Sequence, residues 1–140
     1  MATLDEMIPW FESLSKEKVD RVREFYADDA SFRDPFNDVR GRDAITRVFA
    51  HMFEQASDIR IEVHERFEKP DAAVITWTFW LRPRGMALLQ IPGATHLRFN
   101  ERGLVIAHRD YWDVAEELYA RVPGFGAVMR WLQRRLRTPL

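Results

Sequence analysis

A carboxylate set among aromatic residues is the first group in this sequence that could move a proton. Asp34 precedes Pro35, which favours an extended backbone at Asp34 and so fixes the direction of its side chain. Phe32 and Phe36 lie two residues to either side. If these rings surround the carboxyl, the loss of water raises its pKa, as a general base working near neutrality requires. The alternative is structural, because an Asp-Pro pair often begins a turn.

A second candidate group lies near the end of the last predicted strand. Alternate side chains of a strand share a face, so His108, Asp110 and Trp112 point the same way. A histidine and a carboxylate beside an aromatic wall are suited to acid–base chemistry. The alternative is that Asp110 forms a structural ion pair with an arginine. If Asp34 and Asp110 share a cavity, their repulsion raises the pKa of one, so one could act as acid and the other as base.

Composition limits the classes of function. The chain has 140 residues, no cysteine and a formal net charge of -1. This length fits a single domain, 1–140, and the absence of cysteine excludes disulfides and thiolate chemistry. The near-zero charge argues against a nucleic-acid partner, and neither a secretory signal nor a membrane-spanning run is visible, so a cytoplasmic protein is expected. The histidine spacing indicates no metal site.

Helical periodicity in the first part of the chain gives way to strand periodicity. Apolar spacing predicts helices over residues 3–14, 15–26 and 45–56. Alternation of apolar and polar residues predicts strands over 30–32, 59–63, 72–81, 87–99 and 104–113, with a bulge or bend at Pro92-Gly93. Helices followed by a strand meander predict an α+β fold, with helices packed on one face of a curved antiparallel sheet.

One predicted strand has two partly apolar faces. Thr76, Thr78 and Trp80 share one face, while Trp77 and Phe79 share the other. A large exposed apolar patch is unusual on a monomer, so we expect one face to line a pocket and a second subunit to cover the other. We assign the face with the two threonines to the pocket.

The following strand alternates in the same way. Thr95 and Leu97 share the face that we expect to line the pocket. His96 then lies on the outer face, where a place at a dimer interface or on the surface is favoured over a catalytic role.

Several segments resemble ketosteroid isomerase and the wider nuclear transport factor 2-like superfamily, which includes SnoaL-type polyketide cyclases. They are Tyr26–Ala30, Asp34–Phe36, Gly41–Arg42, Leu97–Gly103 and Tyr111–Trp112. The resemblance covers residues 4–113 and implies a cone in which a bent sheet wraps around helices and leaves a mostly apolar pocket. It also implies a homodimer through the outer sheet face and chemistry that needs no cofactor. Residues 1–113 then form the cone, and 114–140 a C-terminal helical extension.

The resemblance also suggests roles for individual residues. Asp34 falls on the general base of the isomerase, whereas SnoaL-type cyclases use a sheet aspartate, which makes Asp110 a rival. Trp112 falls on a position that lines the pocket. Trp10 and Thr95 stand where the isomerase has the tyrosine and the protonated aspartate that hold the enolate oxygen. Because that donor pair is replaced, steroid isomerisation itself is not assigned.

Three hypotheses of function follow. In the first, Asp34 or Asp110 catalyses cofactor-free proton transfer on a small apolar carbonyl compound, and His108 helps to polarise or orient that compound. The residues expected to bind that compound are Trp10, Phe36, Phe53, Thr76, Thr78, Trp80, Thr95, Leu97 and Trp112. The second hypothesis is a non-catalytic module that binds an apolar ligand. The third is a structural dimer whose side chains fill the cone, since this scaffold does not fix function.

The C-terminal segment is basic and amphipathic. Phe125, Val128, Met129, Leu132 and Leu136 form a helical stripe, and arginines lie between them with no acidic residue after Glu117. A solvated basic face is the favoured interpretation. Contact with an anionic membrane surface or an acidic partner, and a lid over the cone mouth, are the alternatives.

Overall fold

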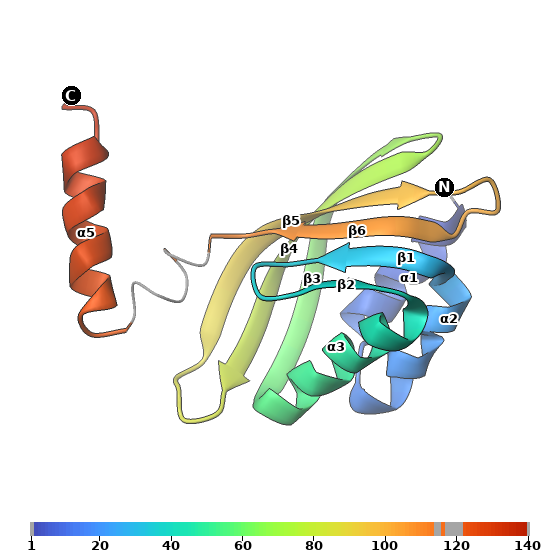
Figure 1. The fold of residues 1–140 in the computed structure, drawn as a ribbon, viewed down its shortest axis with the longest axis horizontal. Coiled ribbons are helices and arrows are strands. Elements are labelled where there is room, and N and C mark those ends of the chain that lie inside the picture. Colours follow the sequence, from blue (N-terminus) through green and yellow to red (C-terminus); the bar gives the residue numbers. More distant parts are fainter. Residues whose placement is uncertain (1, 114–115, 117–121, 140) are drawn as a thin grey trace.

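The helices of the first part of the chain gather on one side of a curved sheet (Figure 1). The computed structural model describes residues 2–113, 116 and 122–139. The helical elements are α1 (Ala2–Glu12), the 3-10 helix η1 (Lys16–Arg21), α2 (Val22–Phe25), α3 (Arg42–Gln55) and α5 (Phe125–Leu136). The apolar stripe predicted for α3 is turned toward the core, where Ile45 and Phe49 are buried.

Six strands form one sheet in the order β2-β1-β6-β5-β4-β3. They are β1 (Tyr26–Arg33), β2 (Asp38–Arg40), β3 (Ala56–Lys69), β4 (Ala72–Pro83), β5 (Leu89–Phe99) and β6 (Val105–Tyr111). The predicted α+β architecture is confirmed, with one correction. The sheet is mixed rather than wholly antiparallel, because β1 pairs with β6 in parallel. This pairing occupies an edge of β6 that the meander alone would leave open.

Three local predictions also need correction. The helix expected from Ser15 to Tyr26 is a 3-10 helix followed by a short α-helix, and Ser15 makes no side-chain capping bond. The chain enters β1 at Tyr26, without the break expected after it, because Tyr26 pairs with Val105. Strand β2 was not predicted.

The bulge expected at Pro92-Gly93 is absent from the pairing of β4 with β5. Gly93 lies opposite Trp77 and Pro92 opposite Thr78 in an unbroken register. The glycine serves another purpose there, since a Cβ at Gly93 would come within 2.4 Å of the Trp77 ring. The missing side chain lets the indole lie flat on β5.

The core lies between the helices and the sheet. Its largest fully buried side chains include Trp10, Phe25, Tyr26, Phe32 and Ile45. The Thr3 hydroxyl at the start of α1 donates a 2.6 Å bond to the carbonyl of Gly103, which ties α1 to the β5–β6 turn. The helix runs through Pro9.

Helix α5 stands apart from the sheet and from the other helices (Figure 1). In this arrangement α5 does not cover the mouth of the cone, so the lid that the sequence analysis gave as one alternative is not formed. Helical structure was also expected at 118–119, which lies outside the described residues. No described helix has both the length and the apolar character needed to cross a membrane.

Candidate functional site

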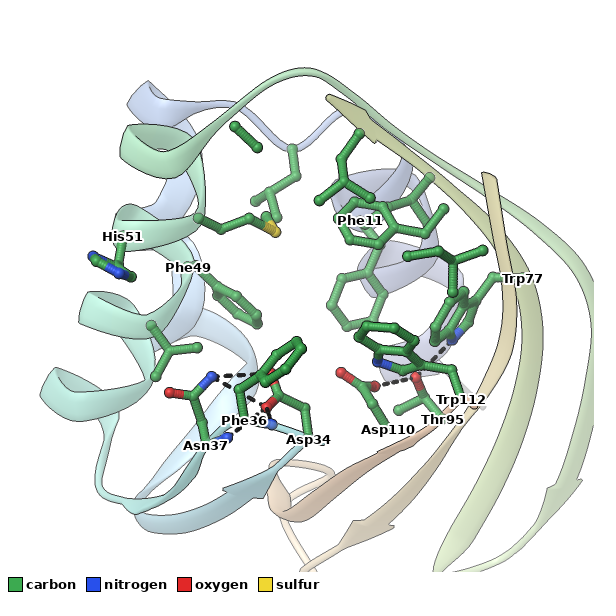
Figure 2. A pocket seen from close by; sticks show the side chains of 18 of the residues that line it. Phe11, Asp34, Phe36, Asn37, Phe49, His51, Trp77, Thr95, Asp110 and Trp112 are labelled. Atoms are coloured by element: carbon green, nitrogen blue, oxygen red, sulfur yellow. Dashed lines mark hydrogen bonds between the residues drawn. The ribbon is translucent and has the colours of Figure 1, made fainter. Parts of the chain in front are cut away.

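A cavity of about 480 Å³ opens between α3 and the inner face of the sheet (Figure 2). This volume lies within the usual range for sites that bind small molecules. Apolar side chains form most of its wall, among them Phe11, Phe32, Phe49, Met52, Ile75, Trp77, Phe79, Leu89 and Ile91. Polar groups are few and include Asp34, Asn37, Thr95, His108 and Asp110.

Asp110 is a carboxylate of this cavity that is anchored through one of its two oxygens. Its Oδ1 accepts a 2.6 Å hydrogen bond from the Thr95 hydroxyl and lies 2.8 Å from Nε2 of His108. The side chain is 20% exposed. Among the described residues, Oδ2 has no hydrogen-bond partner. One oxygen therefore anchors the group, and the other is available to a ligand.

The hydrogen bonds around Asp110 form a chain whose directions can be assigned. A carboxylate only accepts, so Nε2 of His108 carries a proton and donates to Asp110. In the tautomer that carries its one proton on Nε2, Nδ1 is an acceptor, and the Tyr26 hydroxyl, 2.7 Å away, donates to it. On the other side, Trp77 Nε1 donates to the Thr95 oxygen at 2.8 Å, which leaves the Thr95 proton for Asp110. Every donor in this network is directed toward one carboxylate.

Aromatic rings enclose the histidine of this chain. The ring of Phe32 lies 4.6 Å from that of His108, and the rings of Tyr26 and Phe11 lie at 5.9 Å and 6.1 Å. Burial raises the pKa of Tyr26 well above its ordinary value, and the negative charge of Asp110 adds to the rise. The tyrosine therefore stays protonated as a donor across the neutral range.

Asp34 also lines the cavity, but its oxygens are engaged in a turn. Oδ1 accepts backbone N–H bonds from Phe36 at 2.8 Å and from Asn37 at 2.7 Å. The amide of Asn37 donates to both oxygens at 3.1 and 3.2 Å. The sequence left open whether Asp34 starts a turn or acts as a base, and the geometry favours the turn.

The parallel pairing of β1 with β6 explains why Asp34 and Asp110 line the same cavity. Arg33 pairs with Arg109, so Asp34 and Asp110 each follow that pair at the same end of neighbouring strands. Both carboxylates face the cavity (Figure 2). Phe36 and Trp112 lie beside them, with ring centres 5.7 Å apart in an edge contact.

The face of β4 that lines the cavity is the opposite of the one predicted. Thr76, Thr78 and Trp80 lie on the outer face, while Trp77 and Phe79 line the cavity. On the outer face the Thr78 hydroxyl lies 2.7 Å from His64, that of Thr76 accepts from the backbone N–H of Glu65, and Arg60 stacks on Trp80. The larger apolar surface of the other face explains the outcome, because burying it is more favourable.

Three other residues expected to bind a ligand lie outside the cavity wall. Trp10 is buried in the core, and its indole N–H donates to the carbonyl of Lys18 at 3.0 Å. Leu97 is fully buried, and Phe53 packs against the edge of the core. Of the predicted binding residues, the cavity wall contains Phe36, Thr95 and Trp112, together with Asp34, His108 and Asp110.

Two members of the hydrogen-bond chain were not predicted from the sequence. Tyr26 was placed at the end of a helical stripe, and Trp77 on the face assigned to a partner. The alternation of β4 separates Trp77 from Thr78 but does not indicate which of the two faces the cavity. No local signal marks Tyr26, because its contact with His108 spans 82 positions of the chain.

Two other histidines lie apart from the hydrogen-bond chain of Asp110. His51 on α3 lines the cavity, and its Nδ1 lies 3.7 Å from a carboxylate oxygen of Glu54. His64 lies beside Thr78 on the outer face of the sheet. Within the described ranges 2–113, 116 and 122–139, no group of three or more His, Asp or Glu side chains is arranged to hold a metal ion.

Comparisons with known proteins agree with this fold. Residues 9–108 match the family model of the SnoaL-like domain. No curated protein matches the chain.

Solved structures with similar folds have low sequence identity to this chain. A protein with a ketosteroid isomerase-like fold from Catenulispora acidiphila, in complex with trimethylamine, is 15% identical over 83% of this chain and 88% of that chain, with a TM-score of 0.71. A putative SnoaL-like polyketide cyclase from Jannaschia is 18% identical over 81% and 84%, with a TM-score of 0.69. An epoxide hydrolase from Mycobacterium tuberculosis is 17% identical over 92% and 93%, with a TM-score of 0.67. The TM-scores show a shared fold, and at these low identities the similarity concerns the fold alone.

Proposed function

The chain belongs to the SnoaL-like domain family, of the nuclear transport factor 2-like superfamily, and on that premise we propose that it transfers a proton on a small apolar carbonyl compound. Asp110 is the base, and the reaction needs no cofactor. The observation that carries this proposal is the free Oδ2 of Asp110 inside an apolar cavity, at the end of a chain of donors that orient the carboxylate.

The proposed step is removal of a proton from the carbon next to the carbonyl. Oδ2 of Asp110 takes the proton, and the electron pair of the broken C–H bond moves to the carbonyl oxygen as an enolate. His108 and Thr95 hold Oδ1, so the base keeps one direction. Return of the same proton at another carbon gives isomerisation, and loss of a neighbouring hydroxyl as water gives dehydration. Attack of the enolate carbon on a second carbonyl of the same substrate gives cyclisation.

Trp112 is the donor that we assign to the enolate oxygen. It lies two residues after Asp110 and lines the same cavity. Its indole N–H has no hydrogen-bond partner among the described residues. In a site that excludes water, one fixed donor stabilises developing charge more than it would in solvent. Asp34 shapes the mouth of the site through its turn with Asn37.

Deuterium exchange on simple ketones tests this proposal and does not require the natural substrate. The chain is incubated in D2O with cyclohexanone, acetophenone or β-tetralone, and NMR follows the protons next to each carbonyl. Catalysed exchange of at least one ketone above the buffer rate is the expected result. A chain that binds these ketones without accelerating exchange has the alternative function described next.

The alternative function is a non-catalytic module that binds an apolar ligand. The donors that the family resemblance placed at the enolate oxygen are both engaged elsewhere, which favours this alternative. Trp10 donates to Lys18, and the Thr95 hydroxyl donates to Asp110. Native mass spectrometry of the purified chain identifies this function by a co-purified apolar molecule in the absence of any exchange activity.

We also propose a homodimer through the outer face of the sheet. Phe67, opposite Val74 on β3 and β4, is 56% exposed there, and Tyr111 of β6 is half exposed. Sedimentation velocity is expected to give twice the mass of one chain for the wild type and the mass of one chain for Phe67→Glu. Leu88→Glu, a matched change in the β4–β5 loop, is expected to remain dimeric. A monomeric wild type would rule out this interface.

A further inference from the structure

Helix α5 carries an apolar face that the described chain does not cover. Val128, Leu132 and Leu136 follow a spacing of four residues and so lie on one side of the helix. Their exposed fractions are 53%, 37% and 82%, and Trp131 is 52% exposed. Burying side chains of this size is favourable, so an exposed stripe of them marks a contact surface.

The other side of α5 is strongly positive. Arg130, Arg134 and Arg137 recur at spacings of four and three residues, and Arg135 lies over the Trp131 ring at 5.6 Å. Residues 122–139 contain four arginines and neither Asp nor Glu. The chain as a whole has a net charge of -1, so this charge is a local feature.

We propose that α5 is an interfacial helix that binds the chain to an anionic lipid surface. An apolar stripe with a tryptophan, on a helix whose polar residues are mostly arginines, is typical of helices that lie in the plane of a membrane. The apolar side chains enter the headgroup boundary while the arginines attract anionic lipids from within a Debye length. The proposal does not depend on the chemistry proposed for the cavity.

Charge and shape favour lipid over a second copy of this chain. A protein partner would have to offer an apolar groove with acidic residues around it. The large exposed apolar side chains of the remaining described chain do not form one row. They lie on the β1–β2 turn, on β3, in the β4–β5 loop, on β6 and just before α5, at Phe36, Phe67, Met86, Leu88, Ile106, Tyr111 and Val122. A lipid surface offers both apolar acyl chains and anionic headgroups, and it needs no preformed groove.

Vesicle co-sedimentation of the full chain tests the proposal. The chain is expected to bind vesicles of phosphatidylglycerol mixed with phosphatidylcholine, to bind phosphatidylcholine alone far more weakly, and to be released by salt. Arg130→Gln with Arg134→Gln is expected to weaken binding about 25-fold, at about fivefold for each arginine. Trp131→Ser with Leu132→Ser is expected to abolish sedimentation although it leaves every charge in place.

Matched variants outside α5 control for charge and for apolar surface. Arg98→Gln on β5 and Leu88→Ser in the β4–β5 loop are both exposed and are expected to bind as the wild type does. Sedimentation velocity of each variant without vesicles reports self-association. The proposal is overturned if the wild type binds neither kind of vesicle, or if both α5 variants bind as well as the wild type does. It is also overturned if the Trp131 and Leu132 changes dissociate a dimer, because α5 would then contact a second copy.

Discussion

Replacing Asp110 by Asn is expected to slow deuterium exchange of the reactive ketone by about 10²–10⁴-fold. The amide oxygen can still accept the hydrogen bond that Thr95 donates to Oδ1, so the side chain keeps its place. The variant loses only the ability to accept a proton from carbon. Binding of the ketone, measured by the chemical shifts of protein amides, is expected to change little.

Asp34→Asn is the matched control, because it makes the same chemical change at the second carboxylate of the same cavity. An asparagine can accept the backbone N–H bonds of Phe36 and Asn37, so the turn is expected to persist. We expect exchange within about tenfold of the wild-type rate, less than the loss of a general base would cause. Equal losses in both variants would mean that the aspartates act as a pair. A loss confined to Asp34→Asn would transfer the role of base to that residue.

Replacing Tyr26 by Phe is expected to lower the free energy of unfolding by about 1–3 kcal/mol. The change leaves Nδ1 of His108 without its 2.7 Å partner in a fully buried place, while the ring volume is preserved. Urea denaturation measures the loss. A matched change at Tyr111, which is half exposed, is expected to alter stability by less than about 0.5 kcal/mol. Equal stability of Tyr26→Phe and the wild type would contradict the assigned hydrogen bond.

The Tyr26→Phe change is also expected to alter how the free energy of unfolding depends on pH in the alkaline range. Burial raises the pKa of Tyr26 in the folded chain above its ordinary value of 10.0, and Asp110 adds to the rise. Above about pH 10 the unfolded tyrosine releases a proton that the folded one keeps, so wild-type stability falls by about 1.4 kcal/mol per pH unit. The contribution is fully present below that pH. Tyr26→Phe is expected to remove this part of the decline, and an unchanged slope would contradict the assignment.

The local sequence pattern was sufficient to predict the buried side of an element where one face of that element is clearly apolar. The stripe on α3 predicted the side of that helix that is buried. Alternation placed His108, Asp110 and Trp112 on one face, and the family resemblance indicated that this face lines the pocket. For Asp34 the Asp-Pro pair left a turn and a catalytic role open, and the observed hydrogen bonds form a turn.

The sequence could not predict the orientation of an element whose two faces have similar local patterns, nor the pairing of distant segments. Both faces of β4 are partly apolar, so alternation separates Trp77 from Thr78 but does not say which of them points inward. The parallel contact of β1 with β6 is made between distant segments, and no nearby residue encodes it. The contact of Tyr26 with His108 depends on that pairing, so it could not be predicted either.

The most direct test of the central claim is a crystal structure of the chain with β-tetralone bound. The account predicts the ketone inside the cavity, with the carbon next to its carbonyl about 3–3.5 Å from Oδ2 of Asp110 and its oxygen toward the indole N–H of Trp112. A ketone whose reactive carbon lies against Asp34, or a cavity closed by the protein's own side chains, would contradict it.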